Sequence, residues 1–295
     1  MKTTLFFICL LFATSALAQT SPTFEIEGHR GARGLLPENT IPSFIKALEY
    51  GVKTIELDVV VSRDNKLVVS HEPWFSSVIS LDPKGNPIPA EKQKEHNIYN
   101  MNYSEIKKYD VGSLGNKDFP EQQKMKTYKP LLSEVFVEIG KYVKKNKLQP
   151  VRYNIEINSN PEGDNTFHPL PAIFAKMVYD EILAHKLEKN VIVQSFDVRP
   201  LQELRKFEVK LPLALLVANK DGIEKNLEKL GFVPDTYSPH FSLIDEPTVQ
   251  YVRQKGMKII PWTINETSDM ERMKQFNLDG IITDYPDRAV KVFRK

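Results

Sequence analysis

The chain alternates short apolar runs with longer segments in which apolar residues recur every three or four positions, almost to its end. The short runs predict β-strands and the longer segments predict helices. Alternating strands and helices are typical of a parallel sheet. Nine strand-like runs are visible, at residues 24–30, 53–61, 66–72, 152–158, 191–196, 212–218, 236–241, 257–264 and 279–284.

The connection between the second and third runs is too short for a crossover helix, because only residues 62–65 lie between them. We therefore expect an antiparallel hairpin there. Removing its return strand leaves eight strand–helix units over about 260 residues, the size and rhythm of a TIM (β/α)8 barrel. An open doubly wound sheet is the alternative. A polar stretch rich in proline and glycine, at about residues 74–129, predicts a small insertion after the hairpin.

Helix boundaries also leave signals in the sequence. Asn39 and Thr40 precede the first helical segment as candidate N-caps, and Gly51 follows it as a candidate C-terminal stop. The segment from Ser268 to Glu271 has the spacing of a capping box, which predicts a helix start with Ser268 as its cap.

The N-terminus has the composition of an export signal. Lys2 precedes an apolar run at residues 5–13, and Ala16 and Ala18 form an A-x-A cleavage pattern. Residues 1–18 are therefore predicted to be a signal peptide and residues 19–295 a single barrel domain, exported to a periplasmic or secreted location. An uncleaved N-terminal anchor is the alternative. After cleavage, we expect no stable membrane insertion.

The amino-acid composition limits the classes of binding partner that we expect. The formal net charge is only +2, which gives no support for a nucleic-acid binder. The single cysteine, Cys9, lies within the predicted signal peptide, so the mature chain would contain no disulfide. A domain of this size buries enough surface to fold without one. The expected partner is a small molecule.

Chemically active side chains stand where the predicted strands end, at positions where a structural core would prefer valine or leucine. In a TIM barrel these ends form the catalytic face. The residues are His29, Arg30, Glu56, Asp58, His71 and Glu156.

Two of these carboxylates are two positions apart, so Glu56 and Asp58 share one face of a strand. Burying both without a positive partner would cost several kcal/mol each. A divalent cation, with Glu156 as the third ligand, would compensate them, and an all-oxygen set favours Mg²⁺ or Ca²⁺ over zinc. The alternative is a structural ion network in which Arg30 neutralises the carboxylates.

The two histidines, His29 and His71, are a potential general base and general acid for one displacement. Arg30 provides a planar fork suited to phosphate. A cation, an arginine and two imidazoles describe phosphodiester chemistry better than acyl transfer, and the chain has no G-x-S-x-G elbow.

At this point the sequence resembles a known family, the glycerophosphodiester phosphodiesterases. The matching segments occur in the family's order over about residues 27–286: HRGARGLLPENT, ELDVVVSRDNKLVVSHE, IEI, QSF, PWTIN and DGIITDYP. The resemblance implies a TIM barrel that hydrolyses glycerophosphodiesters to an alcohol and glycerol 3-phosphate.

Residue by residue, the resemblance implies an acid/base pair, one divalent cation (Ca²⁺ or Mg²⁺) on three carboxylates, and a set of substrate contacts. It also implies that the insertion caps the glycerol side. The pair is His29 and His71; the cation ligands are Glu56, Asp58 and Glu156; the substrate contacts are Arg30, Glu38, Asn39, Phe196 and Trp262.

One position departs from the family pattern. A lysine usually follows the third carboxylate by two residues, but Asn158 stands there. Losing that cation should weaken charge stabilisation beside the phosphate. Arg33 and Lys126 are candidate replacements, and the change puts the preferred substrate in question rather than the reaction.

Three alternatives stay open at this stage. The enzyme could act on another phosphodiester, such as a lipid headgroup or a phosphorylated glycan. It could act on intact lipid. A barrel could also bind phosphodiesters without turnover, although such a protein would not need two histidines. Two reaction routes are also open: attack by the glycerol 2-hydroxyl through a cyclic phosphate, or direct attack by water.

Overall fold

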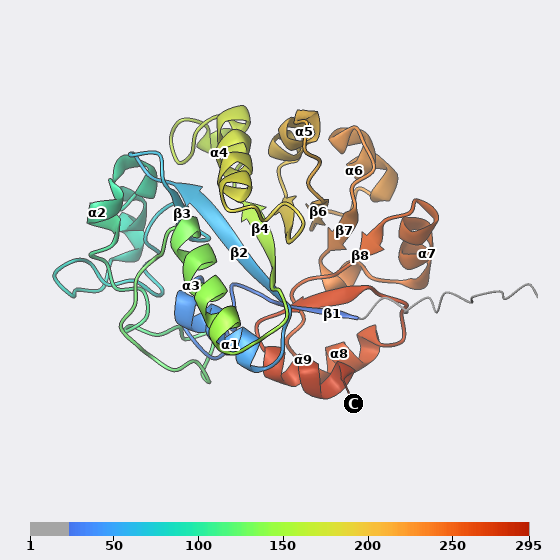
Figure 1. Ribbon diagram of the computed structural model, residues 1–295, viewed down its shortest axis with the longest axis horizontal. Coiled ribbons are helices and arrows are strands. Elements are labelled where there is room, and N and C mark those ends of the chain that lie inside the picture. Colours follow the sequence, from blue (N-terminus) through green and yellow to red (C-terminus); the bar gives the residue numbers. More distant parts are fainter. Residues whose placement is uncertain (1–23, 295) are drawn as a thin grey trace, which may run out of the picture.

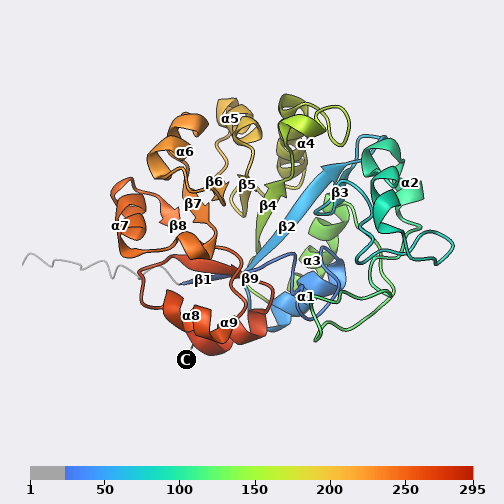
Figure 2. The same ribbon diagram turned by 180° about the vertical axis from the view of Figure 1, so that it is seen from behind.

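The computed structural model describes residues 24–294. Eight parallel strands form one sheet that curves into a nearly closed barrel, with helices around its outside (Figures 1 and 2). The strands lie in the order β8-β7-β6-β5-β4-β2-β1-β9. The TIM (β/α)8 barrel expected from the sequence is confirmed. The strands are β1 (Glu25–Gly28), β2 (Thr54–Val61), β4 (Arg152–Ile157), β5 (Val191–Ser195), β6 (Leu213–Val217), β7 (Thr236–Pro239), β8 (Lys258–Ile259) and β9 (Gly280–Thr283).

The seam between β8 and β9 is held by backbone hydrogen bonds rather than by a regular ladder. The amide of Asp279 donates to the carbonyl of Ile259 at 3.1 Å, and that of Ile282 donates to Pro261 at 2.9 Å. These bonds satisfy the edges that an open sheet would expose.

The helices other than Tyr103–Ile106 cover the outside of the barrel through their apolar faces. The main core cluster contains the inner faces of these helices and the outward-facing residues of the strands. The helices are α1 (Ile41–Glu49), α2 (Tyr103–Ile106), α3 (Leu132–Lys145), α4 (Pro171–Ala184), α5 (Val198–Lys206), α6 (Ile223–Leu230), α7 (Glu246–Gln254), α8 (Thr267–Met273) and α9 (Pro286–Phe293).

The hairpin predicted from the short connection is confirmed. β3 (Leu67–Val69) pairs antiparallel with β2, with Val59 opposite Val69 and Val61 opposite Leu67. Because β3 returns along β2, the residues after it come back over the barrel mouth.

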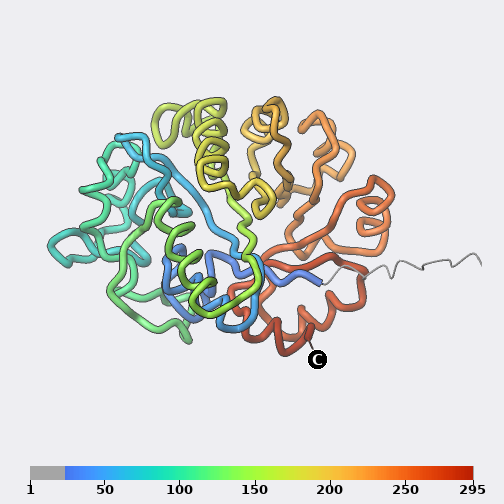
Figure 3. Tube along the Cα trace, in the orientation of Figure 1, coloured from blue at the N-terminus to red at the C-terminus, as the bar shows by residue number. Residues whose placement is uncertain are grey.

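Between β3 and α3 the chain makes a long excursion to one side of the barrel (Figure 3). It contains α2 and two short 3-10 helices, η1 (Ala90–Glu95) and η2 (Ile98–Asn100). A second, smaller core holds it on the β2–β3 hairpin, formed by Val60, Val68, Phe75, Ile88, Ile98, Ile106, Tyr109 and Val111.

Two of the three boundary signals are confirmed. Thr40 is the N-cap of α1 and its side chain accepts from the amide of Ser43, and Gly51 has the positive φ (+84°) of a helix stop. The capping box is wrong: α8 begins at Thr267, ahead of Ser268, and has no side-chain cap. A tertiary contact fixes this entry instead, because Arg288 donates to the carbonyl of Asn265 at 3.0 Å.

The predicted signal peptide, residues 1–18, lies outside the residues that the structure describes. Among residues 24–294, the helices are all too short or too polar to cross a membrane.

Candidate active site

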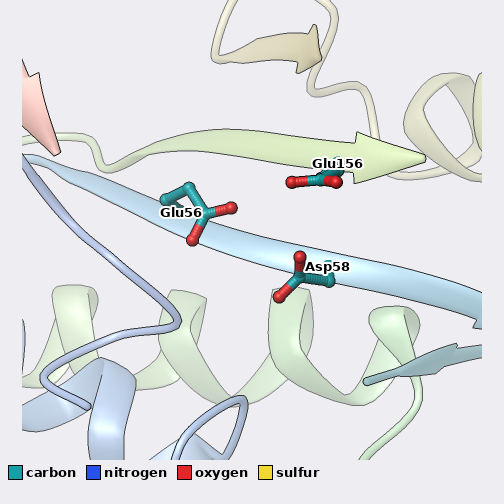
Figure 4. Close-up of side chains that lie close together, drawn as sticks. All are labelled: Glu56, Asp58 and Glu156. Carbon is teal, nitrogen blue, oxygen red and sulfur yellow. The ribbon is translucent and has the colours of Figure 1, made fainter. Parts of the chain in front are cut away.

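The side chains singled out in the sequence converge at the carboxyl ends of the strands. Arg30 and His29 follow β1, His71 follows β3, and the three carboxylates come from β2 and β4 (Figure 4). Oxygen atoms of Glu56, Asp58 and Glu156 all lie within 4.8 Å of one another. The strand register explains the approach, since Asp58 stands directly beside Glu156 in the β2–β4 ladder.

The three carboxylates are buried, with exposed fractions of 1%, 1% and 7% for Glu56, Asp58 and Glu156. Burial, and then the neighbouring carboxylates, raise the pKa of Glu156 to about 8 and that of Glu56 well above its usual range. Burial acts in the same direction on Asp58, but Arg30, His71 and the hydrogen bond from Asn39 together outweigh it and lower the pKa of Asp58. The cluster therefore needs more positive charge than Arg30 supplies if all three groups are to ionise.

The donor set fits a hard divalent cation. Three carboxylates offer the oxygen ligands that Ca²⁺ and Mg²⁺ prefer. One of the buried oxygens, Asp58 Oδ1, has no hydrogen-bond partner within the described chain. A buried acceptor without a partner normally has an explanation, and a cation between the three groups is one.

Arg30 lies at the centre of this charge. Its Nη1 donates to Glu38 Oε1 at 2.8 Å, its Nε lies 3.4 Å from Asp58 Oδ2, and its backbone amide donates to Glu56 Oε2 at 2.8 Å. Asn39 also holds Asp58 in place, because its Nδ2 donates to Asp58 Oδ2 at 2.7 Å. Glu38 and Asn39 do not line the pocket that contains His29, Arg30, Glu56 and His71. In this geometry Glu38 positions Arg30, and Asn39 positions Asp58.

The loop that carries these residues requires glycine at two places. Gly31 has φ +88°, and a Cβ there would lie 2.5 Å from Ser43 Oγ. At Gly34 a Cβ would overlap the Tyr285 ring. The glycines of this segment thus let the loop pack tightly against α1 and the end of β9.

His29 is held by a residue that we did not single out in the sequence. Its Nδ1 lies 2.7 Å from Oδ1 of Asp284, which is fully buried and also accepts two hydrogen bonds from Arg33. An Nδ1–H that donates to Asp284 leaves the Nε2 lone pair free for the pocket. Burial, followed by the guanidinium groups of Arg33 and Arg30, lowers the pKa of His29 to about 4. The sequence offered one indication that Asp284 belongs to the site, because it is a carboxylate at the end of the strand-like run 279–284.

His71 has a different environment. Its Nδ1 lies 2.9 Å from Glu72 Oε1, and its carbonyl accepts from Asn158 Nδ2 at 2.7 Å. Burial and Arg30 lower the pKa of His71, but Asp58 and Glu72 outweigh them and raise it above its ordinary value. Asn158 therefore fixes the backbone of His71, where the family usually has a cation.

Neither Arg33 nor Lys126, the two candidate replacements for the family's lysine, offers a free cation inside the pocket. Arg33 lines the pocket but is bound to Asp284, and Lys126 is exposed. The nearby buried ammonium is instead Lys129, only 4% exposed, which donates to Ser70 Oγ at 2.7 Å. Sequence reasoning missed Lys129 because it lies in the polar insertion, away from any strand pattern.

Aromatic side chains form the other wall of a pocket of about 160 Å³ that also contains His29, Arg30, Glu56 and His71. Phe196 and Trp262 both line it, with ring centroids 5.2 Å apart at 87°. The indole of Trp262 is fixed by a hydrogen bond to the carbonyl of Ser238 at 2.9 Å. His240 packs against Trp262 at 5.2 Å but does not line the pocket.

A (β/α)8 barrel whose mouth combines a buried carboxylate cluster, an arginine and two oriented histidines defines a phosphoric diester hydrolase. Comparison with known proteins identifies the group. The Glycerophosphoryl diester phosphodiesterase family matches residues 29–288, and the chain belongs to this family.

Individual relatives agree with this assignment. A glycerophosphodiester phosphodiesterase of Caldanaerobacter subterraneus is 31% identical over 270 residues, covering 90% of this chain and 96% of the relative. A solved structure from Silicibacter pomeroyi has a TM-score of 0.81 at 27% identity, covering 92% and 94% of the two chains. An Oleispira antarctica phosphodiesterase, solved with the product sn-glycerol-3-phosphate, shares the fold at a TM-score of 0.72, 22% identity and coverage of 92% and 97%.

Proposed function

We propose that this enzyme hydrolyses glycerophosphodiesters to an alcohol and glycerol 3-phosphate, with His29 as general base and His71 as general acid. The observation that carries this is the pair of oriented imidazoles in one pocket with Arg30. The pKa shifts support these roles, because burial lowers the pKa of His29 to about 4, whereas Asp58 and Glu72 raise that of His71. A protein that only bound phosphodiesters would not need Asp284 and Glu72 to orient them.

Proton transfer then follows from the contacts. Nε2 of His29 accepts the proton of the attacking hydroxyl as the new bond to phosphorus forms. His71 donates its proton to the alcohol oxygen as the old ester bond breaks. The Arg30 guanidinium, fixed by Glu38, faces the negative charge that develops on the phosphate.

Glu56, Asp58 and Glu156 are the residues that would hold one Ca²⁺ or Mg²⁺. When bound, such an ion polarises the non-bridging oxygens of the phosphate. The backbone amide of Arg30 orients Glu56, and its guanidinium orients Asp58.

We also propose that residues 1–18 export the enzyme, so that it meets its substrates in the periplasm or outside the cell. The short apolar run and the A-x-A pattern support this. The N-terminal sequence of the protein purified from its native cells tests it: a start at residue 19 is expected, and an intact Met1 would refute cleavage.

The main test is release of glycerol 3-phosphate from glycerophosphoglycerol and glycerophosphocholine. His29→Ala and His71→Ala should each lower kcat by a factor of about 10² to 10⁴. His185→Ala is the matched control, because that histidine is the C-cap residue of α4, beside Glu181 and away from the pocket. Release of product by both pocket variants at the rate of the control would refute the acid/base assignment.

Two routes remain for the attacking group. If the 2-hydroxyl of glycerol attacks, a cyclic glycerophosphate accumulates and is then opened by water. Rapid-quench sampling followed by ³¹P NMR distinguishes the routes, since direct attack by water forms no cyclic species.

A further inference from the structure

A second cleft, of about 420 Å³, adjoins the catalytic pocket and shares His71 with it. It lies between the insertion and the connection from β4 to α4. The insertion contributes Trp74 and Lys94, and the connection contributes Asn160, Glu162 and Phe167. We refer to it as the insertion cleft.

Hydrogen bonds and packing hold the insertion cleft in shape. Asn97 Nδ2, in the insertion, donates to the carbonyl of Thr166 in the opposite wall at 2.8 Å. Trp74 is bridged to Asn97 through the backbone and meets the Phe167 ring edge-on at 5.2 Å.

The opposite wall is equally fixed. Arg199 donates to both carboxylate oxygens of Asp164, at 2.7 and 3.1 Å. Gly163 packs so closely on His168 that a Cβ would lie 2.5 Å from its Nε2. The cleft is therefore formed before a ligand enters, as small-molecule sites usually are.

A phosphodiester has two ester arms, and the catalytic pocket has room for little more than the phosphate and one of them. Its volume of about 160 Å³ lies below the range of roughly 300 to 1,000 Å³ usual for ligand pockets. An arm that passes His71 enters the insertion cleft directly. Another cleft shares Phe196 and Leu216 with the catalytic pocket, but its carboxylate, Asp197, accepts hydrogen bonds from Arg199 and Ser159 and has no proton to give.

The charged groups that line the insertion cleft limit which class of alcohol it can bind. The Nζ of Lys94 lies 5.2 Å from the centroid of the Trp74 ring, so the aromatic face that would attract a cationic headgroup already has a cation. Glu72 also lines the cleft, but its Oε1 lies 2.9 Å from Nδ1 of His71, so Lys94 and Glu162 remain as one charge of each sign. The carboxylate of Glu162 and the amide of Asn160 can both bond hydroxyls. An aromatic platform with such neighbours suits a polyhydroxy alcohol.

We propose that the insertion cleft binds the leaving alcohol and that Lys94 makes it select uncharged polyols over cationic alcohols. The proposal rests on the proposed function, in which His71 protonates the departing oxygen. It also differs from the expectation, drawn from the resemblance, that the insertion covers the glycerol.

The test compares kcat/KM for glycerophosphoinositol with that for glycerophosphocholine. The wild type should favour glycerophosphoinositol, and Lys94→Glu should shift the ratio roughly tenfold towards glycerophosphocholine, since repulsion becomes attraction. Lys92→Glu is the matched control: Lys92 lies on the same 3-10 helix and is exposed, but does not line the cleft. Its ratio should stay within about twofold of the wild type.

An equal shift in both variants would mean long-range steering and would overturn the proposal, as would a wild-type preference for glycerophosphocholine. Failure to release glycerol 3-phosphate from either substrate would refute the proposed function instead.

Binding gives a readout that does not need turnover. The chain has two tryptophans, so Trp262→Phe leaves Trp74 as the only one. In a Trp262→Phe/His71→Ala protein, glycerophosphoinositol should change the Trp74 fluorescence at lower concentration than glycerophosphocholine does. The reverse order, or no response to glycerophosphoinositol, would count against the cleft as the alcohol site even if no variant is active.

Discussion

Replacing Asp284 with asparagine tests whether catalysis depends on the tautomer of His29. In the wild type the buried carboxylate accepts from Nδ1 of His29 at 2.7 Å and from Arg33 at 2.7 and 3.0 Å. The amide has the same shape but only one acceptor, which Arg33 retains. Its NH₂ group then faces Nδ1, which must accept, and the ring proton moves to Nε2. The lone pair that should receive the substrate proton is lost.

The expected loss follows from the size of general base catalysis, about 10² to 10⁴ in rate, with a wrong tautomer in the serine-protease triad costing about 10⁴. We expect kcat to fall by about 10³ to 10⁴, or roughly 4 to 5.5 kcal/mol of transition-state stabilisation. KM should change little, because Asp284 does not line the pocket. Arg33 loses the nearer of its two ionised partners and keeps Glu38 at 3.8 Å, so the free energy of unfolding should fall by about 1 to 3 kcal/mol.

The assay is steady-state release of glycerol 3-phosphate, with urea unfolding to show that the variant is folded. Asn265→Ala is the matched control, because Asn265 Nδ2 donates to the same carboxylate at 2.7 Å without touching His29. That variant should lose less than tenfold in kcat. A folded Asp284→Asn enzyme with kcat within tenfold of the wild type would refute the tautomer argument.

Three further results are expected. EDTA should abolish turnover, and Ca²⁺ or Mg²⁺ should restore it. Calorimetry in two buffers should show that cation binding at pH 7 releases protons, because the pKa of Glu156 is raised to about 8 before the cation binds. Binding without proton release would contradict the ligand assignment. Lys129→Met should lower kcat about tenfold and raise the free energy of unfolding by about 1 to 2 kcal/mol. The gain in stability is expected because the change removes a buried ammonium whose one acceptor among the described residues is Ser70. Steady-state kinetics and urea unfolding measure the two effects, and a less stable variant would contradict the prediction. The fold lowers the pKa of His29 from 6.5 to about 4, so on acidification the unfolded chain binds this proton before the folded protein does. The free energy of unfolding should therefore fall by about 3 kcal/mol as the pH drops from 6.5 to 4. Urea unfolding of His29→Gln over the same pH range should lack this loss of about 3 kcal/mol.

The parts of the site that the sequence predicted follow from strand geometry. A two-residue period places Glu56 and Asp58 on one face, and parallel strands in a barrel bring Glu156 beside them. The hairpin followed from a connection too short for a helix. These predictions needed only local spacing and the closure of the sheet.

What the sequence did not reveal depends on contacts between distant segments. Lys129 becomes buried because the chain beside it pairs with β3, where Val69 donates to the carbonyl of Pro130 at 2.8 Å. No periodicity marks that pairing. Asp284 meets His29 only because the last strand, β9, pairs with the first, β1, which brings together residues 255 positions apart.

A strand carboxylate is not by itself a sign of a metal, as Glu27 on β1 shows. It is 2% exposed, and burial, with the Glu25 charge second, raises its pKa to about 8. Burial therefore favours its neutral form, and Asn154 Nδ2 donates to its Oε2 at 2.7 Å. The same Nδ2 donates to Gln194 Oε1, whose Nε2 donates to Glu56 Oε1. These amides link Glu27 inside the barrel to the carboxylate cluster at its mouth and orient Glu56. Among residues 24–294, three carboxylates lie within 4.8 Å of one another only at the mouth, and it is this crowding added to burial that calls for a cation there.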